Sequence, residues 1–115
     1  MINDPARPVR PELTVILCTH NPRADYLEQT LAALRAQTLA TEGWELLLVD
    51  NASTHAVADR CDLTWHPNAR AIREDRLGLT MARTCGFRAA QTDVLVLVDD
   101  DNLLAPNYLT NALNL

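Results

Sequence analysis

Residues 94–102 read Val-Leu-Val-Leu-Val-Asp-Asp-Asp-Asn and carry the strongest strand signal in the chain. An uninterrupted run of Val and Leu is typical of a strand that is buried on both faces, as in a parallel sheet. The run ends abruptly in an acidic triplet, Asp99 to Asp101. Because ligands of open α/β sheets bind beyond the carboxyl ends of the strands, these residues predict a buried strand that leads into a polar site.

Two earlier segments show the same change from apolar to polar residues. Residues 13–18 (Leu-Thr-Val-Ile-Leu-Cys) lead into the polar segment 19–22, and residues 44–49 (Trp-Glu-Leu-Leu-Leu-Val) lead into the polar segment 50–54. Each therefore predicts a buried strand followed by a functional turn. If the strands run parallel, all of these polar segments meet at one edge of the sheet.

Helices are expected between the strands. Apolar residues recur at helical spacing over 25–37 and over 77–91. The buried stripes are expected to be Tyr26, Leu27, Leu31 and Leu34 in the first helix, and Leu77, Met81, Cys85 and Ala89 in the second. The less regular segment 55–75 is expected to hold a short helix and a short strand around residues 63–65. This alternation predicts an α/β fold, a Rossmann-like and mostly parallel sheet with helices on both faces.

Length and composition narrow the class of protein. The 115 residues suit one domain, with an extended arm over residues 1–12 and a folded region over residues 13–115. Ten basic against 15 acidic side chains give a net charge of −5, which argues against a nucleic-acid partner. No apolar run is long enough for a transmembrane segment, and the first residues lack a secretory signal. We therefore expect a cytoplasmic protein, either free or held at the inner face of the membrane.

The acidic triplet is the most informative polar cluster. Asp99 and Asp101 are separated by one residue at a strand end and can share a hard divalent cation, Mn²⁺ or Mg²⁺, which prefers oxygen ligands. Such a cation would also relieve the repulsion between adjacent carboxylates. The alternative is a solvated acidic turn. A calcium-binding loop is disfavoured, because Leu104 and Thr110 stand where such a loop has Gly and Glu.

Arginine gathers just before the acidic strand end, with five of the ten between residues 70 and 88. Arg76 and Arg83 are seven positions apart and can share a helix face opposite the apolar stripe. A metal site with guanidinium groups nearby is what a diphosphate leaving group requires. The alternative is an ordinary salt-bridged helix face.

Other polar residues leave two interpretations open. Asp50 either hydrogen-bonds a base or ribose hydroxyl, or caps the following helix, and capping is favoured for Ser53 and Thr54. His20 is either a site residue or an exposed turn residue. The residues expected at the surface are His55 and His66. The cysteines, odd in number and widely spaced, are expected to be free thiols: Cys18, Cys61 and Cys85.

Four segments, taken in order, resemble the nucleotide-binding half of a family 2, GT-A-fold glycosyltransferase. Residues 14–21 (TVILCTHN) resemble the opening strand that usually ends Pro-Thr-Tyr-Asn, and residues 45–54 (ELLLVDNAST) the strand that ends Val-Asp-Asp/Asn-Gly-Ser-Thr. Residues 74–86 (EDRLGLTMARTCG) are similar to the Gly-Leu-Ser-x-Ala-Arg-Asn-x-Gly helix. Residues 97–102 (LVDDDN) match the DxD metal motif, and Pro106 follows it as in the family.

The resemblance implies a role for each matching residue. The nucleotide would be bound by Thr19, His20, Asn21, Asp50, Arg76, Arg83, Asp99 and Asp100. Within this set, Asp50 would contact the base, while Asp99 or Asp100 would hold the ribose. Asp99 and Asp101 would hold the metal, with Asp101 on the cation that bridges the diphosphate. The chain departs from the family pattern at Cys18, His20 and Thr84, where Pro, Tyr and Asn are usual.

The resemblance further implies inverting, metal-dependent transfer of a sugar from a UDP-, GDP- or dTDP-linked donor to a hydroxyl of a glycan, lipid or small molecule. The family's second half, with its acceptor site and general base, has no counterpart in these residues. We therefore expect a region that is incomplete at its C-terminus and holds the donor-binding half.

Two other functions are weighed against this one. The first is a non-catalytic nucleotide-binding fragment. The second is a phosphatase of the haloacid-dehalogenase type, in which an Asp-x-Asp motif opens the domain, whereas here the motif closes the last predicted strand. A dinucleotide-binding enzyme is disfavoured, because no Gly-x-Gly-x-x-Gly follows the first strand.

Overall fold

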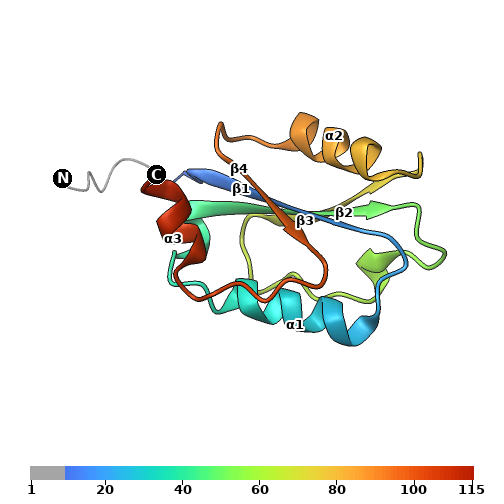
Figure 1. Cartoon of the computed structure of the whole chain (residues 1–115), viewed down its shortest axis with the longest axis horizontal. Helices are drawn as coiled ribbons and strands as arrows, with labels where there is room; N and C mark the ends of the chain where they lie inside the picture. The colour runs from blue at the N-terminus through green and yellow to red at the C-terminus, as the bar shows by residue number, and fades with distance from the viewer. Residues whose placement is uncertain (1–9) are drawn as a thin grey trace.

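The computed structural model describes residues 10–115, so most of the expected arm, residues 1–9, lies outside the described residues. The strands are β1 (Leu13–Thr19), β2 (Trp44–Asn51), β3 (Ala69–Glu74) and β4 (Leu95–Asp99). The helices are α1 (Ala24–Arg35), α2 (Leu79–Ala89) and α3 (Tyr108–Leu113), with short 3₁₀ turns η1 (Thr41–Gly43) and η2 (Val57–Asp59). The strands pair in parallel in the order β3-β2-β1-β4, which confirms the predicted α/β fold (Figure 1).

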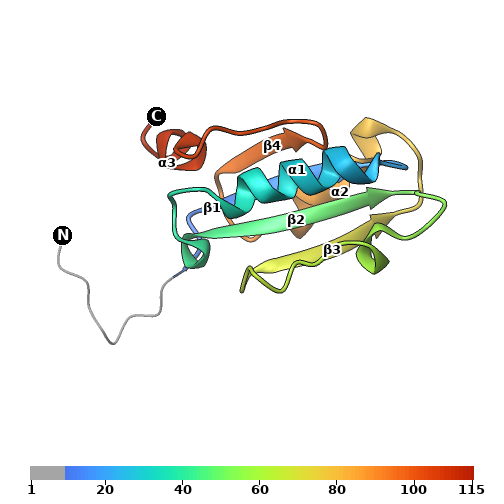
Figure 2. The same cartoon turned by 90° about the horizontal axis from the view of Figure 1, so that it is seen from below.

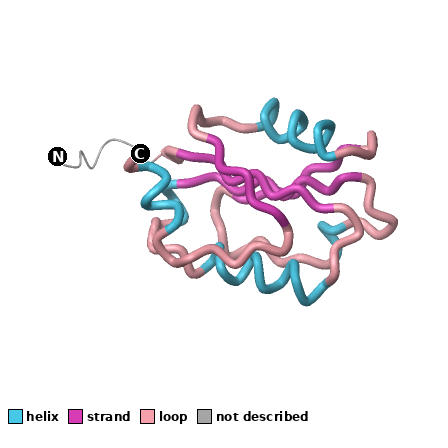
Figure 3. Tube along the Cα trace, in the orientation of Figure 1, coloured by secondary structure: helices cyan, strands magenta, loops and turns pink. Residues whose placement is uncertain are grey.

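The two longer helices lie on opposite faces of the sheet (Figures 1 and 3). On one face, α1 lies beside the return segment, residues 100–107, which leads from β4 back to α3 (Figure 2). On the other face, α2 packs over β1, β2 and β3. Within residues 10–115, no helix is both long enough and apolar enough to cross a membrane.

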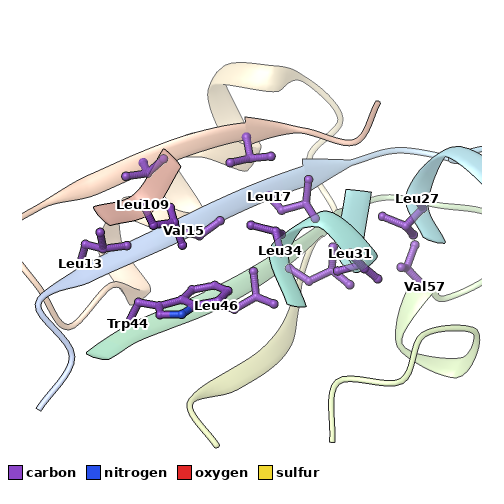
Figure 4. Close-up of a cluster of buried hydrophobic side chains, with 13 residues drawn as sticks. Leu13, Val15, Leu17, Leu27, Leu31, Leu34, Trp44, Leu46, Val57 and Leu109 are labelled. Carbon is purple, nitrogen blue, oxygen red and sulfur yellow. The ribbon is translucent and has the colours of Figure 1, made fainter. Parts of the chain in front are cut away.

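The larger core lies between α1 and the sheet (Figure 4). Leu31 and Leu34 of α1 pack against the sheet, where Val15, Leu46 and Trp44 are fully buried. Burial of each large apolar side chain contributes about 1.5–3 kcal/mol. This cluster therefore fixes the position of α1 under the strands.

The predicted stripe of α1 is confirmed for three of its four residues, Leu27, Leu31 and Leu34, which are buried. Tyr26 is an exception and is exposed, with the guanidinium carbon of Arg23 lying 4.3 Å from the centre of its ring. The cation can interact with the face of the ring without leaving water.

The predicted stripe of α2 is wrong for Leu77, which precedes the helix, and for Met81, which is exposed. Cys85 is partly buried and packs against the cluster of Ile16, but the fully buried residues of α2 are Ala82 and Gly86. A Cβ placed on Gly86 would lie 2.5 Å from Cγ2 of Ile16 in β1. The helix therefore packs on the sheet through its smallest residues, because only they allow so close an approach.

The strand β4 lies at the edge of the sheet, and its side chains alternate between exposed and buried. Val96 and Val98 join the core beneath α1, whereas Leu95 and Leu97 are exposed on the other face. The expectation of burial on both faces is wrong for β4, because α2 packs over the other three strands.

The third strand is Ala69–Glu74, so the prediction of a strand around residues 63–65 is wrong. Those residues form a turn in which Asp62 accepts hydrogen bonds from the main-chain N–H and the hydroxyl of Thr64. His66 follows this turn and is buried, which corrects the expectation that it lies at the surface. His55 is exposed, as predicted.

The packing of α2 leads to a prediction for Gly86→Ala. The added methyl group has no room beside Ile16, so the free energy of unfolding should fall by about 1–3 kcal/mol in urea denaturation. Gly43→Ala is the matched control, because its added Cβ would meet nothing closer than 3.5 Å. Equal stability of Gly86→Ala and the parent chain would contradict the close approach of α2 to β1.

The burial of His66 leads to a prediction about acid stability. Its ring lies 4.3 Å from that of Trp44, Nδ1 accepts the main-chain N–H of Asn68, and burial lowers the pKa of the imidazole below 6.5. The unfolded chain then binds more protons than the folded chain below about pH 6.5. Stability should therefore be fully present above that pH and decline as the pH falls through the lowered pKa.

Denaturation of His66→Phe between pH 5 and pH 7 tests this expectation. The variant keeps the aromatic packing and should show a weaker decline of the unfolding free energy toward acid than the parent chain. His55→Asn removes an exposed histidine and should keep the parental decline. An unchanged pH dependence in His66→Phe would assign the effect to another group.

Candidate functional site

A cavity of about 460 Å³ opens at the carboxyl edge of the sheet. This volume lies within the usual range of small-molecule sites. The strands contribute Cys18, Thr19, Asn51 and Asp99, and the adjoining loops and α2 contribute His20, Leu77, Gly78, Leu79, Ala82, Asp100 and Asp101. The structure thus brings the polar ends of β1, β2 and β4 together, as the strand pattern predicts.

Not all of the predicted site residues line this cavity. Those that do are Thr19, His20, Asp99, Asp100 and Asp101. Those that do not are Asn21, Asp50, Arg76 and Arg83. The residues of the second group make other contacts within the protein.

The acidic triplet divides into one bonded and two free carboxylates. Asp100 accepts a hydrogen bond of 2.7 Å from the hydroxyl of Thr19 at Oδ2, and its main-chain carbonyl accepts one of 2.8 Å from the hydroxyl of Thr30. Within residues 10–115, no hydrogen bond or ion pair engages the carboxylates of Asp99 and Asp101. Both of these side chains are exposed and border the cavity.

The carboxylates of Asp99 and Asp101 suit a hard divalent cation that arrives with a phosphorylated ligand. Among residues 10–115, no group of three or more His, Cys, Asp or Glu side chains is arranged to hold a metal by itself. Mg²⁺ is commonly held by one or two carboxylates together with phosphate oxygens and water. These two carboxylates therefore fit a cation that is also coordinated by a bound ligand better than a cation coordinated by protein alone.

The loops after β1 and β2 are locked to each other through Asn21. Its main-chain N–H donates to Oγ of Ser53 at 2.9 Å, and its side-chain oxygen accepts the N–H of Thr54 at 2.8 Å. Asn21 adopts a φ of 44°, a left-handed conformation that Asn tolerates well. Ser53 and Thr54 thus bind Asn21 and cap no helix, which corrects that expectation.

Asp50 is buried and holds the loop that follows β2. Its carboxylate accepts the N–H of Ser53 at 3.1 Å and of Val57 at 2.9 Å, and Nη1 of Arg73 lies 3.2 Å away. Burial alone would raise the pKa of Asp50, but these hydrogen bonds and the nearby guanidinium outweigh it and lower the pKa. The carboxylate thus holds the first residue of η2 in place, and a contact of Asp50 with a base or ribose stays a prediction.

Asn51 borders the cavity, although the sequence analysis assigned it no role. Its side-chain nitrogen donates to the carbonyls of Glu74 and Arg76 at 3.0 and 2.9 Å, and its oxygen accepts the N–H of Gly78 at 2.9 Å. Asn51 thereby shapes the loop between β3 and α2, where Gly78 adopts a φ of 143°. One sequence signal could have pointed to Asn51. Successive side chains of a strand point to opposite faces of the sheet, so Asp50 and Asn51 cannot face the same side.

The predicted arginines lie outside the cavity lining. Arg76 forms an ion pair of 2.6 Å with Glu74, and its side chain is 62% exposed. Arg83 is half-buried on α2, near the thiol of Cys18. Burial raises the pKa of Cys18 to about 11 despite the opposing charge of Arg83, so this wall of the cavity carries a neutral thiol at pH 7.

The fold and the cavity define an α/β protein with a polar ligand site at the carboxyl edge of a parallel sheet. The family model described as glycosyl transferase family 2 matches residues 14–115. This chain therefore belongs to glycosyl transferase family 2, and the resemblance seen in the sequence is confirmed.

Individual relatives agree with this assignment. Validoxylamine A glucosyltransferase of Streptomyces hygroscopicus subsp. jinggangensis (strain 5008) is 32% identical over 107 residues, which cover 90% of this chain and 25% of that protein. The mannosyltransferase PcManGT of Pyrobaculum calidifontis, solved in complex with GDP-Man and Mn²⁺, is 32% identical with a TM-score of 0.71, over 95% of this chain and 32% of that one.

The structure of S. aureus TarS 1–349 in complex with UDP-GlcNAc matches with a TM-score of 0.79 at 20% identity, over 90% of this chain and 30% of that one. At this identity the match concerns the fold. The chain spans a third or less of the length of each of these three proteins.

The contacts of Asn51 predict that Asn51→Asp is not a conservative change. An aspartate has no N–H to donate and would turn an oxygen toward the carbonyls of Glu74 and Arg76. Leaving these groups unpaired should lower the free energy of unfolding by about 1–3 kcal/mol and speed amide hydrogen exchange over residues 75–79.

Asn111→Asp is the matched control for this prediction, because it makes the same chemical change on the exposed surface of α3. It should leave both the stability and the exchange of residues 75–79 close to those of the parent chain. If Asn51→Asp behaved like this control, the role of Asn51 in shaping the loop would be refuted.

Proposed function

We propose that this chain binds the nucleotide-diphosphate part of a sugar donor in the cavity at the carboxyl edge of the sheet. The observation that carries the proposal is the convergence of Thr19, His20, Asn51, Asp99 and Asp101 on one cavity in a member of glycosyl transferase family 2. For the complete enzyme we propose a metal-dependent transfer of the sugar to a hydroxyl acceptor, with inversion of configuration at the anomeric carbon.

The residues divide into two groups by their proposed roles. Thr19 and His20 bind the nucleoside, because they border the cavity where β1 ends. Asn51 shapes the adjoining wall instead, because its side-chain amide is already hydrogen-bonded to the loop before α2. Asp99 and Asp101 hold Mn²⁺ or Mg²⁺, whose bound form neutralises the charge that develops on a departing diphosphate. Asp100 is assigned to neither group, because Thr19 already bonds its carboxylate.

Asn21 and Asp50 support the nucleoside site from behind. Their hydrogen bonds fix the loops after β1 and β2, so they shape the cavity without bordering it. Arg76 and Arg83 do not border the cavity, so we propose that they attract a diphosphate by their charge rather than contact it there. Within residues 10–115 we assign no general base, so donor binding is the activity we propose for the isolated chain.

The donor is expected to be linked to UDP, GDP or dTDP. Support for the first two comes from the structures that resemble this chain, because TarS is solved with UDP-GlcNAc and PcManGT with GDP-Man and Mn²⁺. The second structure also supports the use of a divalent cation. The acceptor hydroxyl belongs to a glycan, a lipid or a small molecule.

Calorimetric titration of UDP, GDP and dTDP, each with and without Mn²⁺, tests the proposal. At least one nucleotide should bind the folded chain, and Mn²⁺ should strengthen that binding. Asp101→Asn should weaken the Mn²⁺-dependent binding by roughly tenfold or more, because it removes the charge of one of two carboxylate ligands.

Asp93→Asn is the matched control, because Asp93 is exposed and does not border the cavity. It should bind like the parent chain. A folded parent chain that binds none of the nucleotides would overturn the proposal, and Mn²⁺-dependent binding that survives in Asp101→Asn would remove the metal role of that residue.

A further inference from the structure

We propose that Thr30 of α1 is a positioning residue for the acidic end of β4. It holds the main chain at Asp100, and the flanking carboxylates of Asp99 and Asp101 are thereby kept at the cavity for the cation and diphosphate. This inference rests on the proposed function, because it assigns those two carboxylates to a ligand.

Asp100 is fixed at two points by two different elements. The hydroxyl of Thr19, at the end of β1, donates to its carboxylate at 2.7 Å, and the hydroxyl of Thr30, in the middle of α1, donates to its main-chain carbonyl at 2.8 Å. The first bond orients the side chain and the second fixes the backbone. The middle acid is therefore an anchor that leaves its two neighbours available.

The place of Thr30 in α1 argues against a purely local role. It is fully buried on the same helix face as Leu27, Leu31 and Leu34. A hydroxyl in such surroundings lowers stability unless it is hydrogen-bonded, and in helices it commonly bonds a carbonyl of the preceding turn. Here it bonds a carbonyl 70 positions further along the chain.

The return segment is held to α1 a second time, beyond the acidic residues. The side chain of Gln37, just after the helix, donates to the carbonyl of Ala105 at 2.8 Å and accepts the N–H of Leu109 at 3.0 Å. The N–H of Thr38 donates to the carbonyl of Pro106 at 2.8 Å. Figures 1 and 2 show the segment lying along α1 between these two attachments.

These attachments make α1 a brace for the acidic segment. Thr30 lies in the middle of α1, and Gln37 lies two residues beyond its end at Arg35. The attachment at Thr30 is the one next to the carboxylates, and it opposes the mutual repulsion of three adjacent negative charges. Without it, the backbone at Asp100 is held only through its own side chain, by the hydroxyl of Thr19, and through the turn bond from the N–H of Asn102 to the carbonyl of Asp99.

The test compares Thr30→Val, which keeps the shape and removes the hydroxyl, with Thr30→Ser, which restores the hydroxyl. Thr30→Val should weaken the Mn²⁺-dependent binding of UDP or GDP by roughly 10-fold to 100-fold, the usual effect of removing a residue that orients metal ligands. Thr30→Ser should bind within a few-fold of the parent chain. Amide exchange over residues 100–104 should be faster in Thr30→Val alone.

Thr14→Val separates positioning from general stability. Thr14 is also fully buried, and its hydroxyl bonds Glu45 at 2.9 Å at the opposite end of β1 from the cavity. This variant should lose stability in urea denaturation to a similar degree and still bind Mn²⁺ and nucleotide like the parent chain. If Thr30→Val fails to fold, Thr30→Ala removes the same hydroxyl with a smaller side chain.

The inference is overturned if the folded variant without the hydroxyl binds like the parent, if Thr14→Val loses binding equally, or if Thr30→Ser restores nothing. In each of these cases the parent chain still binds nucleotide, and the proposed function stands. A parent chain that binds neither UDP nor GDP with Mn²⁺ refutes the proposed function and this inference together.

Discussion

The parallel register of β1 with its two neighbours is the constraint on which the site depends. Thr19 of β1 pairs with Asp50 of β2, and Cys18 pairs with Asp99 of β4. All three strands therefore stop at the same level, and their last residues meet at one edge. A shift of either neighbour by one residue would turn its side chains to the opposite face and separate the polar ends from one another.

The two faces of the sheet support this edge in different ways. On the face that α1 covers, large side chains of α1 form a thick core, and the return segment is hydrogen-bonded by Thr30 of α1 and by Gln37 just beyond its end. On the face that α2 covers, Gly86 allows α2 to lie close to Ile16, and this positions Leu79 and Ala82 in the cavity wall. The cavity thus lies between a helix that braces the acidic residues and a helix placed by close contact.

Much of this arrangement could be predicted from the sequence, because the signals are local. Runs such as residues 44–49 and 94–98 identify strands by composition, and the polar residues after them identify the functional edge. The buried face of α2 could not be predicted, because its apolar residues suggest another stripe. The choice of Ala82 and Gly86 depends on Ile16, which is distant in the chain.

The hydrogen bonds that Asp50 and Asn51 make within the protein could not be predicted, for a similar reason. Both are polar residues at the end of β2, and either can bind a ligand. Their positions are decided by partners far along the chain, since Asp50 bonds Val57 and Arg73, whereas Asn51 bonds the loop at Gly78.

The acidic triplet has a further consequence for binding. Two exposed carboxylates, those of Asp99 and Asp101, provide too few ligands to hold a small dication strongly without a third partner, and residues 10–115 supply no larger cluster. Under the proposed function, the oxygens of a diphosphate would complete the coordination, so the affinity for the cation and the affinity for the nucleotide would depend on each other. By thermodynamic linkage, each must raise the affinity of the other by the same factor. A rigid Asp100 would strengthen the binding of both ligands, because carboxylates already in place lose less conformational freedom on binding.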